Sequence, residues 1–93
     1  MPPPARDTAA RIADTRARLE GDVDCWVSTA DEAGVPHLVP LSFLWTDGRI
    51  LVSTAERSAT ARNLRRGGHA RVALGHTRDV VMVDVVVETI ELA

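Results

Sequence analysis

Residues 57–63 hold the densest group of side chains able to do chemistry, at the start of a predicted helix. A helix N-terminus leaves backbone N–H groups unpaired and carries partial positive charge, so an anion there gains hydrogen bonds and a favourable dipole interaction. Ser58 and Thr60 would add hydroxyl donors, and Arg57 and Arg62 would add charge-assisted ones. This pattern is compatible with a phosphate-binding site.

The alternative is an ordinary surface helix that uses Ser58 only as its N-cap. Arg65 and Arg66 would then be solvated at the carboxyl end, where cations also interact favourably with the helix dipole. Taken by itself, the residue pattern favours this plain helix.

Neither a nucleophile–base set nor a metal site is indicated by the spacing of the polar residues. No histidine is placed beside a serine by any motif, and the three histidines show no metal-ligand spacing with one another. Asp84 and Glu88 lie at i and i+4 on a predicted strand, roughly 13 Å apart at normal strand rise, too far to share a proton. The single Cys25 has no partner for a disulfide or a thiolate cluster and is interpreted as a small core residue.

Length and composition limit the classes of protein to which these residues can belong. With 93 residues, 45% of them hydrophobic, the chain predicts one small globular domain over residues 7–93, after a proline-rich, flexible lead at 1–6. A net charge of −2 excludes a global field that attracts nucleic acid or an anionic membrane. No run approaches the roughly 18 apolar residues of a membrane span, and no signal peptide is visible, so we expect a cytoplasmic protein.

Two helices and five strands are predicted to position the polar residues. The first helix runs from Asp7 or Thr8 through Leu19 to Gly21, and its thin apolar stripe suggests that it lies across an opening of a larger body. Strands at 23–28, 37–45 and 49–54 form an antiparallel series, joined by a turn at 31–34 and an Asp-Gly hairpin at 47–48. A helix at 56–66, capped by Ser58 and stopped by two glycines, precedes strands at 69–75 and 80–92.

The alternation within the strand at 37–45 assigns its side chains to two faces. His37, Val39, Leu41, Phe43 and Trp45 share one face, with Trp45 expected to fill the core. Pro40, on the other face, cannot donate to a ladder, so the strand is either an edge there or bulges and turns its backbone toward something else. A planar ligand would suit such a site, and an edge proline that discourages aggregation is equally compatible.

The order of elements, together with the stretch PHLVPLSFLWTDGRILVSTAERSATARNLRRGGHARVAL, resembles the pyridoxamine phosphate oxidase-like flavin-binding split-barrel proteins, particularly their small actinobacterial branch. The resemblance spans about residues 11–92, and its most specific part is residues 36–74. It implies a mainly β fold with short helices, an antiparallel split barrel of the FMN-binding type, and a cofactor that is FMN or an F-420-type deazaflavin. Family members usually continue for another strand and a helix, so ending at Ala93 suggests a barrel truncated at its C-terminus.

The resemblance also implies which residues bind the cofactor. Its ring would lie against the backbone of the second strand, and this would account for the proline there. The end of the next strand would supply hydroxyls near the ribityl chain, and the start of the second helix would face the phosphate. The cofactor-binding residues implied in this way are Val39, Pro40, Leu41, Ser42, Ser53, Thr54, Ser58, Ala59, Thr60, Arg62 and Asn63.

Thr60 departs from the family, in which a lysine commonly contacts the phosphate at that position. A neutral hydroxyl replaces an ammonium group, so affinity for a phosphorylated flavin should fall unless Arg57 or Arg62 compensates. Family barrels are dimers with cofactor sites along the interface, and we expect a homodimer here. The sequence leaves three functions open: a flavin- or deazaflavin-dependent oxidoreductase of unknown small-molecule substrate, a cofactor-binding protein without turnover, and a structural split barrel that has lost its site.

Overall fold

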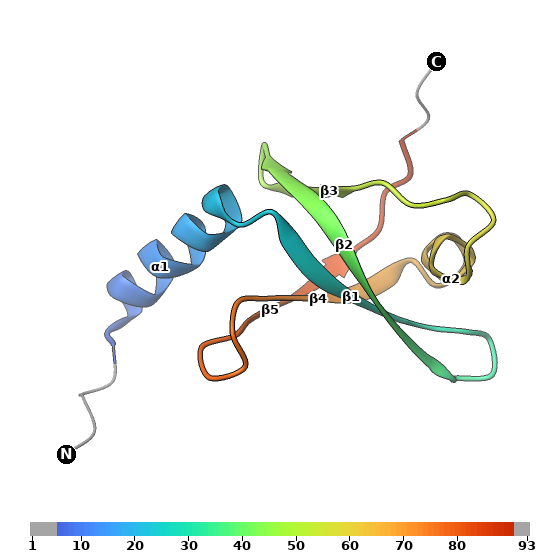
Figure 1. Ribbon diagram of the computed structural model, residues 1–93, viewed down its shortest axis with the longest axis horizontal. Helices are drawn as coiled ribbons and strands as arrows, with labels where there is room; N and C mark the ends of the chain where they lie inside the picture. Colours follow the sequence, from blue (N-terminus) through green and yellow to red (C-terminus); the bar gives the residue numbers. More distant parts are fainter. Residues whose placement is uncertain (1–5, 91–93) are drawn as a thin grey trace.

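The computed structural model describes residues 6–90, in which five antiparallel strands curl into a half-barrel with two short helices (Figure 1). Residues 1–5 of the predicted lead and residues 91–92 of the predicted last strand lie outside the described residues. The order of strands in the sheet is β3-β2-β1-β4-β5. This mainly β architecture confirms the predicted fold class, the antiparallel split barrel. The helices and strands are α1 (Thr8–Gly21), β1 (Asp24–Ala30), β2 (Pro36–Thr46), β3 (Arg49–Val52), α2 (Ala59–Gly67), β4 (His69–Leu74) and β5 (Val81–Val86).

The core lies on the concave face of the sheet, where alternate residues of each strand point inward. Cys25 and Val27 of β1, Phe43 of β2 and Val72 and Leu74 of β4 are buried there. Trp45 packs against this cluster as predicted. The predicted alternation along β2 is confirmed, because its odd-numbered residues are covered while Leu38, Pro40, Ser42 and Leu44 are exposed.

Helix α1 begins as predicted, with Asp7 as N-cap accepting a hydrogen bond from the backbone N–H of Ala10 at 2.7 Å. The prediction that this helix lies across an opening is wrong. Leu19 is its one buried residue, Ile12 is 52% exposed, and Figure 1 shows the helix projecting away from the sheet. Its apolar stripe is too thin to cover a second surface. No helix within residues 6–90 has the length and apolar character needed to cross a bilayer.

The β2–β3 hairpin turns at Asp47 and Gly48, which both have positive φ (51° and 72°), as primed turns require. Strand β3 ends at Val52, which pairs with Phe43. The prediction placed Ser53 and Thr54 within this strand, but both lie beyond its end. Helix α2 starts at Ala59 instead of residue 56 because Ser58, in an extended conformation, is its N-cap.

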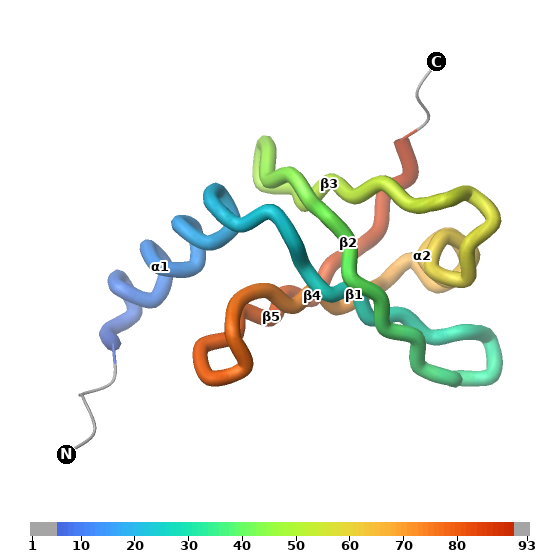
Figure 2. Tube along the Cα trace, in the orientation of Figure 1, coloured from blue at the N-terminus to red at the C-terminus, as the bar shows by residue number. Residues whose placement is uncertain are grey.

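Strand β5 is shorter than the predicted strand at 80–92. Its partner β4 begins at His69, which pairs with Val86, and the N–H of Val87 makes a further backbone hydrogen bond, to Gly68. Beyond that point residues 6–90 offer β5 no further strand to pair with. The following segment turns toward β3 (Figure 2), where Glu88 Oε2 lies 3.6 Å from Arg49 Nη2.

Candidate functional site

The start of α2 is organised by two hydroxyl groups that the sequence identified. Ser58 Oγ accepts the N–H of Ala61 at 3.0 Å and lies 3.2 Å from Thr54 Oγ1. One of the unpaired donors of the first turn is therefore already satisfied by the cap. The N–H groups of Ala59 and Thr60 have no acceptor within the helix, so they are the backbone donors that an anion could use.

One side of α2 is buried against β1. Thr60 is 2% exposed and Asn63 is 7% exposed. Asn63 Nδ2 donates to Thr29 Oγ1 at 3.1 Å, a buried contact between residues far apart in sequence. The side chain of Thr60 is therefore covered by the protein itself, whereas the sequence placed it beside a phosphate.

The arginines of α2 lie on its exposed side, and each of three donates to a backbone carbonyl. Arg62 Nη1 bonds the carbonyl of Arg57 at 2.7 Å, Arg65 Nη2 that of Glu56 at 3.0 Å, and Arg66 Nη2 that of Ala30 at 2.7 Å. A guanidinium has five N–H donors, so each retains donors for a ligand. These bonds also restrict the side chains, which lowers the entropy cost of binding.

The predicted ring-binding segment of β2 is a continuous strand without a bulge. The N–H of Phe43 donates to Val23 of the chain leading into β1, so the odd-numbered residues of β2 direct their backbone groups toward β1. The even-numbered residues Leu38, Pro40 and Ser42 direct theirs the other way. Strand β3 pairs with residues 43–46 only, so this stretch of β2 is an edge.

Pro40 therefore sits where its missing N–H removes no ladder hydrogen bond, which supports the edge interpretation of this proline over the bulge. The side chains around it divide between the two faces of the sheet. Val39 and Leu41 are half-buried toward the core, while Ser42 is exposed and donates its hydroxyl to Asp24 Oδ1 at 3.1 Å. A ligand that lies along this edge meets backbone groups of the even-numbered residues.

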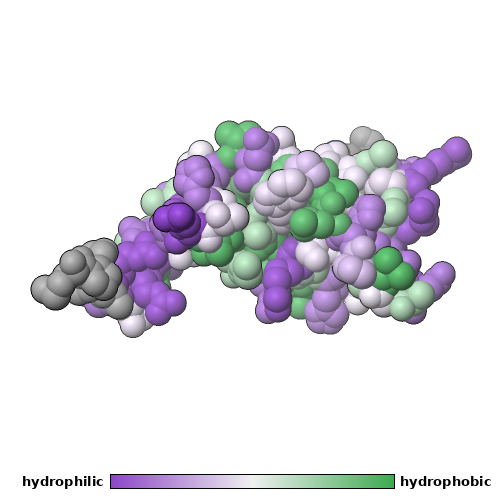
Figure 3. Space-filling model, turned by 60° about the horizontal axis from the view of Figure 1, so that its bottom comes forward, coloured by the Kyte–Doolittle hydropathy of each residue, from purple (hydrophilic) through white to green (hydrophobic). Residues whose placement is uncertain are grey.

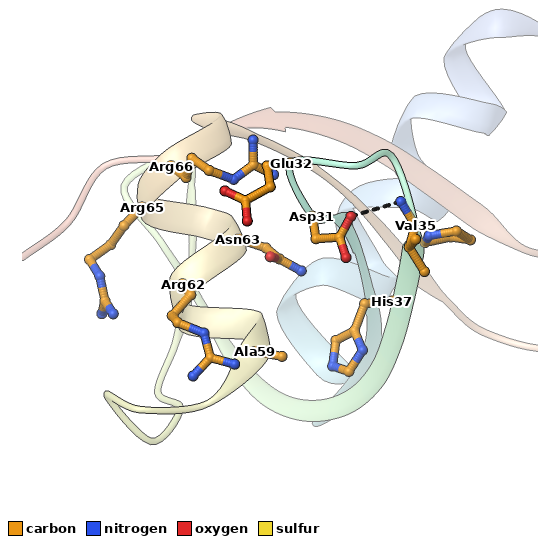
Figure 4. Close-up of a pocket in the computed structure, with 10 residues that line it drawn as sticks. Asp31, Glu32, Val35, His37, Ala59, Arg62, Asn63, Arg65 and Arg66 are labelled. Carbon is orange, nitrogen blue, oxygen red and sulfur yellow. Dashed lines mark hydrogen bonds between the residues drawn. The ribbon is translucent and has the colours of Figure 1, made fainter.

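A groove of about 610 Å³ separates α2 from the turn between β1 and β2 (Figure 4). Ala59, Arg62 and Asn63 are the predicted site residues that line it. It reaches β2 at Pro36 and His37, next to the predicted ring-binding segment but not including it. The other residues that line it are Asp31, Glu32, Val35, Arg65 and Arg66.

Sequence reasoning missed the turn side of this groove. Asp31 was assigned only to a turn, and His37 only to a strand face. Two contacts bring these residues close to α2. The register of the β1–β2 hairpin pairs Thr29 with His37, and Asn63 of α2 donates a hydrogen bond to Thr29. A hairpin register can be derived from the sequence, but the helix contact cannot.

The remaining titratable residues of the described chain do not gather into a second site. Arg71 bonds Asp84 at 2.6 Å on the outer face of the sheet and holds the pKa of that carboxyl below its ordinary value. Burial raises the pKa of the Cys25 thiol, with a smaller effect from the charge of Asp24, so this core cysteine is a poor nucleophile. Within residues 6–90, no group of three or more His, Cys, Asp or Glu side chains is arranged to hold a metal ion.

Comparison with known proteins places these features in a family. The sequence profile of the family described as Pyridoxamine 5'-phosphate oxidase matches residues 13–91. The match begins within α1 and includes all five strands and α2. A search of curated proteins returns no match.

Proposed function

Because the chain belongs to the pyridoxamine 5'-phosphate oxidase family, we propose that it binds FMN or an F-420-type deazaflavin and acts as an oxidoreductase on a small molecule. The ring of the cofactor would lie along the edge of β2, at Val39, Pro40, Leu41 and Ser42. The remaining contacts would come from Ser53, Thr54, Ser58, Ala59, Thr60, Arg62 and Asn63. A bound flavin supplies hydride or electron transfer, so the protein need only orient it and exclude competing reactions.

The unpaired edge of β2 is the observation that carries this proposal. Between residues 38 and 42, the backbone groups of the even-numbered residues point away from β1 and meet no strand of the described chain. A ring system with donors and acceptors along its edge can pair with such groups, as an added strand would. Pro40 leaves one donor fewer on this edge, and this discourages a protein strand more than it discourages a flat ligand.

The phosphate of such a cofactor would bind at the start of α2. Since Thr60 is covered, the contacts available are the N–H groups of Ala59 and Thr60 and the guanidinium groups of Arg57 and Arg62. Arg62 is already held beside this turn by its bond to the carbonyl of Arg57. Charge-assisted hydrogen bonds from arginine would replace the lysine contact that the family commonly has.

Cofactor binding is tested by titrating the purified protein with FMN and, separately, with an F-420-type deazaflavin while following fluorescence quenching. We expect saturable quenching by one of them, and tighter binding is expected to raise the thermal midpoint. The double variant Arg57→Gln/Arg62→Gln should weaken binding by about tenfold or more. The matched control Arg16→Gln, an exposed arginine of α1, should bind as the wild type does.

The absence of quenching and of a thermal shift with both cofactors would remove the flavin proposal. If a cofactor binds, reduction of the bound cofactor by chemical donors distinguishes an oxidoreductase from a carrier. A cofactor that binds tightly but is neither reduced nor reoxidised by any donor or acceptor would contradict the enzymatic part of the proposal and leave cofactor binding intact.

We further propose that the protein is a homodimer that uses the outer face of its sheet. Hydrophobic atoms reach the surface over the sheet, whereas α1 is mostly hydrophilic (Figure 3). Trp26 pairs with Pro40 on one side and with Ala73 on the other, and Met82 continues the same row. Trp26 is 49% exposed and Met82 is 63% exposed, and Leu38 lies beside them at 60%. A second copy of the chain that packs on this face would release the water that covers these apolar side chains.

Light scattering coupled to size exclusion tests this assembly. The wild type is expected to elute as a dimer and the variant Met82→Glu as a monomer, because a buried carboxylate without a partner is strongly unfavourable. Ile12→Glu, at an exposed apolar residue of α1, is the control and should leave the dimer intact. A monomeric wild type, or a dimer unaffected by Met82→Glu, would contradict this choice of face.

A further inference from the structure

The groove between α2 and the β1–β2 turn has walls of opposite charge. Asp31 and Glu32 lie on the turn, and Arg62 and Arg66 lie on the helix. Arg65 also lines the groove, but Figure 4 shows its side chain extending away from the turn. Arg62 is directed toward the start of α2, where it bonds the carbonyl of Arg57, so Arg66 is the helix charge that faces Asp31 and Glu32 across the hollow.

Asp31, Arg62 and Arg66 are each held by hydrogen bonds to the backbone rather than by one another. Asp31 Oδ1 accepts the N–H groups of Ala33 and Val35, both at 2.9 Å, and Arg66 donates to the carbonyl of Ala30. In the part of the chain that the structure describes, no ion pair joins the acidic turn to the arginines of α2. Both walls thus keep charge available for a ligand, and little ordering is needed when one binds.

A buried amide lies between the two walls. The side chain of Asn63 is 7% exposed and points into the groove (Figure 4). Its Nδ2 is engaged by Thr29, and it makes no hydrogen bond with the other residues drawn in that view. Among the described residues no hydrogen bond to the amide oxygen of Asn63 is found, so this oxygen is left as an acceptor for a ligand. A ligand that enters this far must offer it an N–H or O–H donor.

We infer that this groove is a binding site for a small organic zwitterion, with its cationic group toward Asp31 and Glu32 and its carboxylate toward Arg66. A simple anion would be repelled by the acidic turn, and a simple cation by the arginines. The volume of about 610 Å³ lies within the roughly 300–1,000 Å³ of small-molecule sites. The inference goes beyond the proposed flavin function, because it assigns a ligand to the groove whether or not a flavin binds along β2.

The test uses three small amides that differ in which charged ends they carry: glycylglycine as the zwitterion, N-acetylglycine as the anion and glycylglycinamide as the cation. Each is titrated into ¹⁵N-labelled protein, and the backbone signal of His37 and the side-chain amide of Asn63 are followed by NMR. Glycylglycine is expected to shift both signals saturably. It should do so at concentrations about tenfold lower than the other two probes, because only the zwitterion gains charge-assisted hydrogen bonds at both ends.

Three single variants assign the binding to the two walls. Glu32→Gln and Arg66→Gln should each weaken glycylglycine binding by about fivefold or more, and Glu32→Gln should also improve binding of N-acetylglycine. Arg65→Gln, whose side chain extends away from the turn, is the matched control and should bind as the wild type does.

Equal, non-saturating shifts with all three probes would overturn the inference, since they would indicate a solvated charged surface. Preferential binding of N-acetylglycine by the wild type would also overturn it, because the groove would then be an anion site. The flavin titration has a separate readout, fluorescence quenching, and depends on Arg57 and Arg62 rather than on Glu32 and Arg66. Failure of one proposal therefore leaves the other testable.

Discussion

The two helices are attached to the same sheet by opposite kinds of polar contact. Helix α2 is held by the buried hydrogen bond from Asn63 to Thr29 and by its capping serine. Helix α1 buries only Leu19, and its polar contacts with the body are the exposed ones that Arg18, and Arg6 just before the helix, make with Asp79. The contact at α2 is shielded from water, and those at α1 are largely exposed to it.

This difference determines which helix can form part of a precise site. A buried hydrogen bond is costly to break because its partners are left unsatisfied in a medium of low polarity. Exposed ion pairs contribute roughly 0–1 kcal/mol each and are screened by salt. The groove and the proposed phosphate contacts belong to α2, the firmly attached helix. Helix α1 should detach first when the protein is perturbed.

The largest expected effect comes from breaking the buried contact at α2. Asn63→Ala removes the donor to Thr29 and leaves a cavity under the helix, so we expect the free energy of unfolding to fall by about 2–3 kcal/mol. Urea unfolding followed by circular dichroism measures this change. Arg65→Ala, at an exposed residue of the same helix, should change stability by less than about 0.5 kcal/mol.

Thr29→Val removes the acceptor of the same bond and completes a double-mutant cycle with Asn63→Ala. If the bond carries the effect, the two losses should be markedly non-additive, because either change alone already removes it. Additive losses would mean that Asn63 stabilises α2 through packing instead. The comparison between buried and exposed attachment would then lose its physical basis.

The next largest effect is expected at Gly75, because Arg18 of α1 occupies the space that a side chain at this position would need. Gly75 has φ of 87°, and a Cβ there would clash with Arg18 Nη1 and lie 3.0 Å from the carbonyl oxygen of Asp79. Gly75→Ala should therefore cost about 1–2 kcal/mol of unfolding free energy from backbone strain and displace Arg18 from Asp79.

Hydrogen exchange of α1 and α2 amides tests whether this displacement stays local. Exchange in α1 should accelerate while that in α2 does not change beyond the global loss of stability. The control Gly34→Ala, at another glycine of positive φ (80°), adds comparable strain far from Arg18, with nothing within 4 Å of the new Cβ. Equal exchange of α1 in the two variants would show that Arg18 does not hold this helix.

The contrast between the helices also marks how much the sequence could predict. The caps Asp7 and Ser58 and the hairpin at Asp47 and Gly48 are local, since each uses hydrogen bonds or φ values within a few residues. They were predicted correctly, as was the alternation of faces along β2. The order of these elements, together with the residues of the stretch at 36–74, also indicated the family that the comparison shows.

The features that the sequence did not predict depend on contacts between segments distant in sequence. Nothing local indicates that Asn63 bonds Thr29, 34 residues earlier, or that Arg18 meets Asp79, 61 residues later. For the same reason the end of β5 was placed too late, because a strand ends where its partner ends and not where its own apolar alternation stops. The turn wall of the groove was missed because it becomes part of a site only when α2 docks on β1.

A smaller effect is expected from the ion pair itself. Asp79→Asn removes the charge that Arg18 and Arg6 share, and we expect a loss of at most about 1 kcal/mol at low salt that vanishes at high salt. Urea unfolding at two ionic strengths measures it. The effect of Asn63→Ala, by comparison, should not depend on salt. A salt-independent loss in Asp79→Asn would indicate that Asp79 acts through its loop geometry rather than through its charge.

The smallest effect is expected at the exposed pair of Arg71 and Asp84. Hydrogen bonding to Arg71, reinforced by its charge, lowers the pKa of Asp84 in the folded protein, so the pair contributes fully above the ordinary carboxyl pKa. Its contribution is lost as the pH falls below about 4 and through the lowered pKa. Carboxyl carbon shifts in an NMR pH titration should show the pKa of Asp84 returning to its ordinary value in Arg71→Gln. The control Arg49→Gln, which affects the pair with Glu88, should leave the pKa of Asp84 unchanged.

The side chains of Arg71 and Asp84 are both more than half exposed. Acid unfolding should therefore begin at nearly the same pH in Arg71→Gln and in the wild type. A large shift of that pH would show that exposed pairs hold this sheet as firmly as buried contacts hold α2.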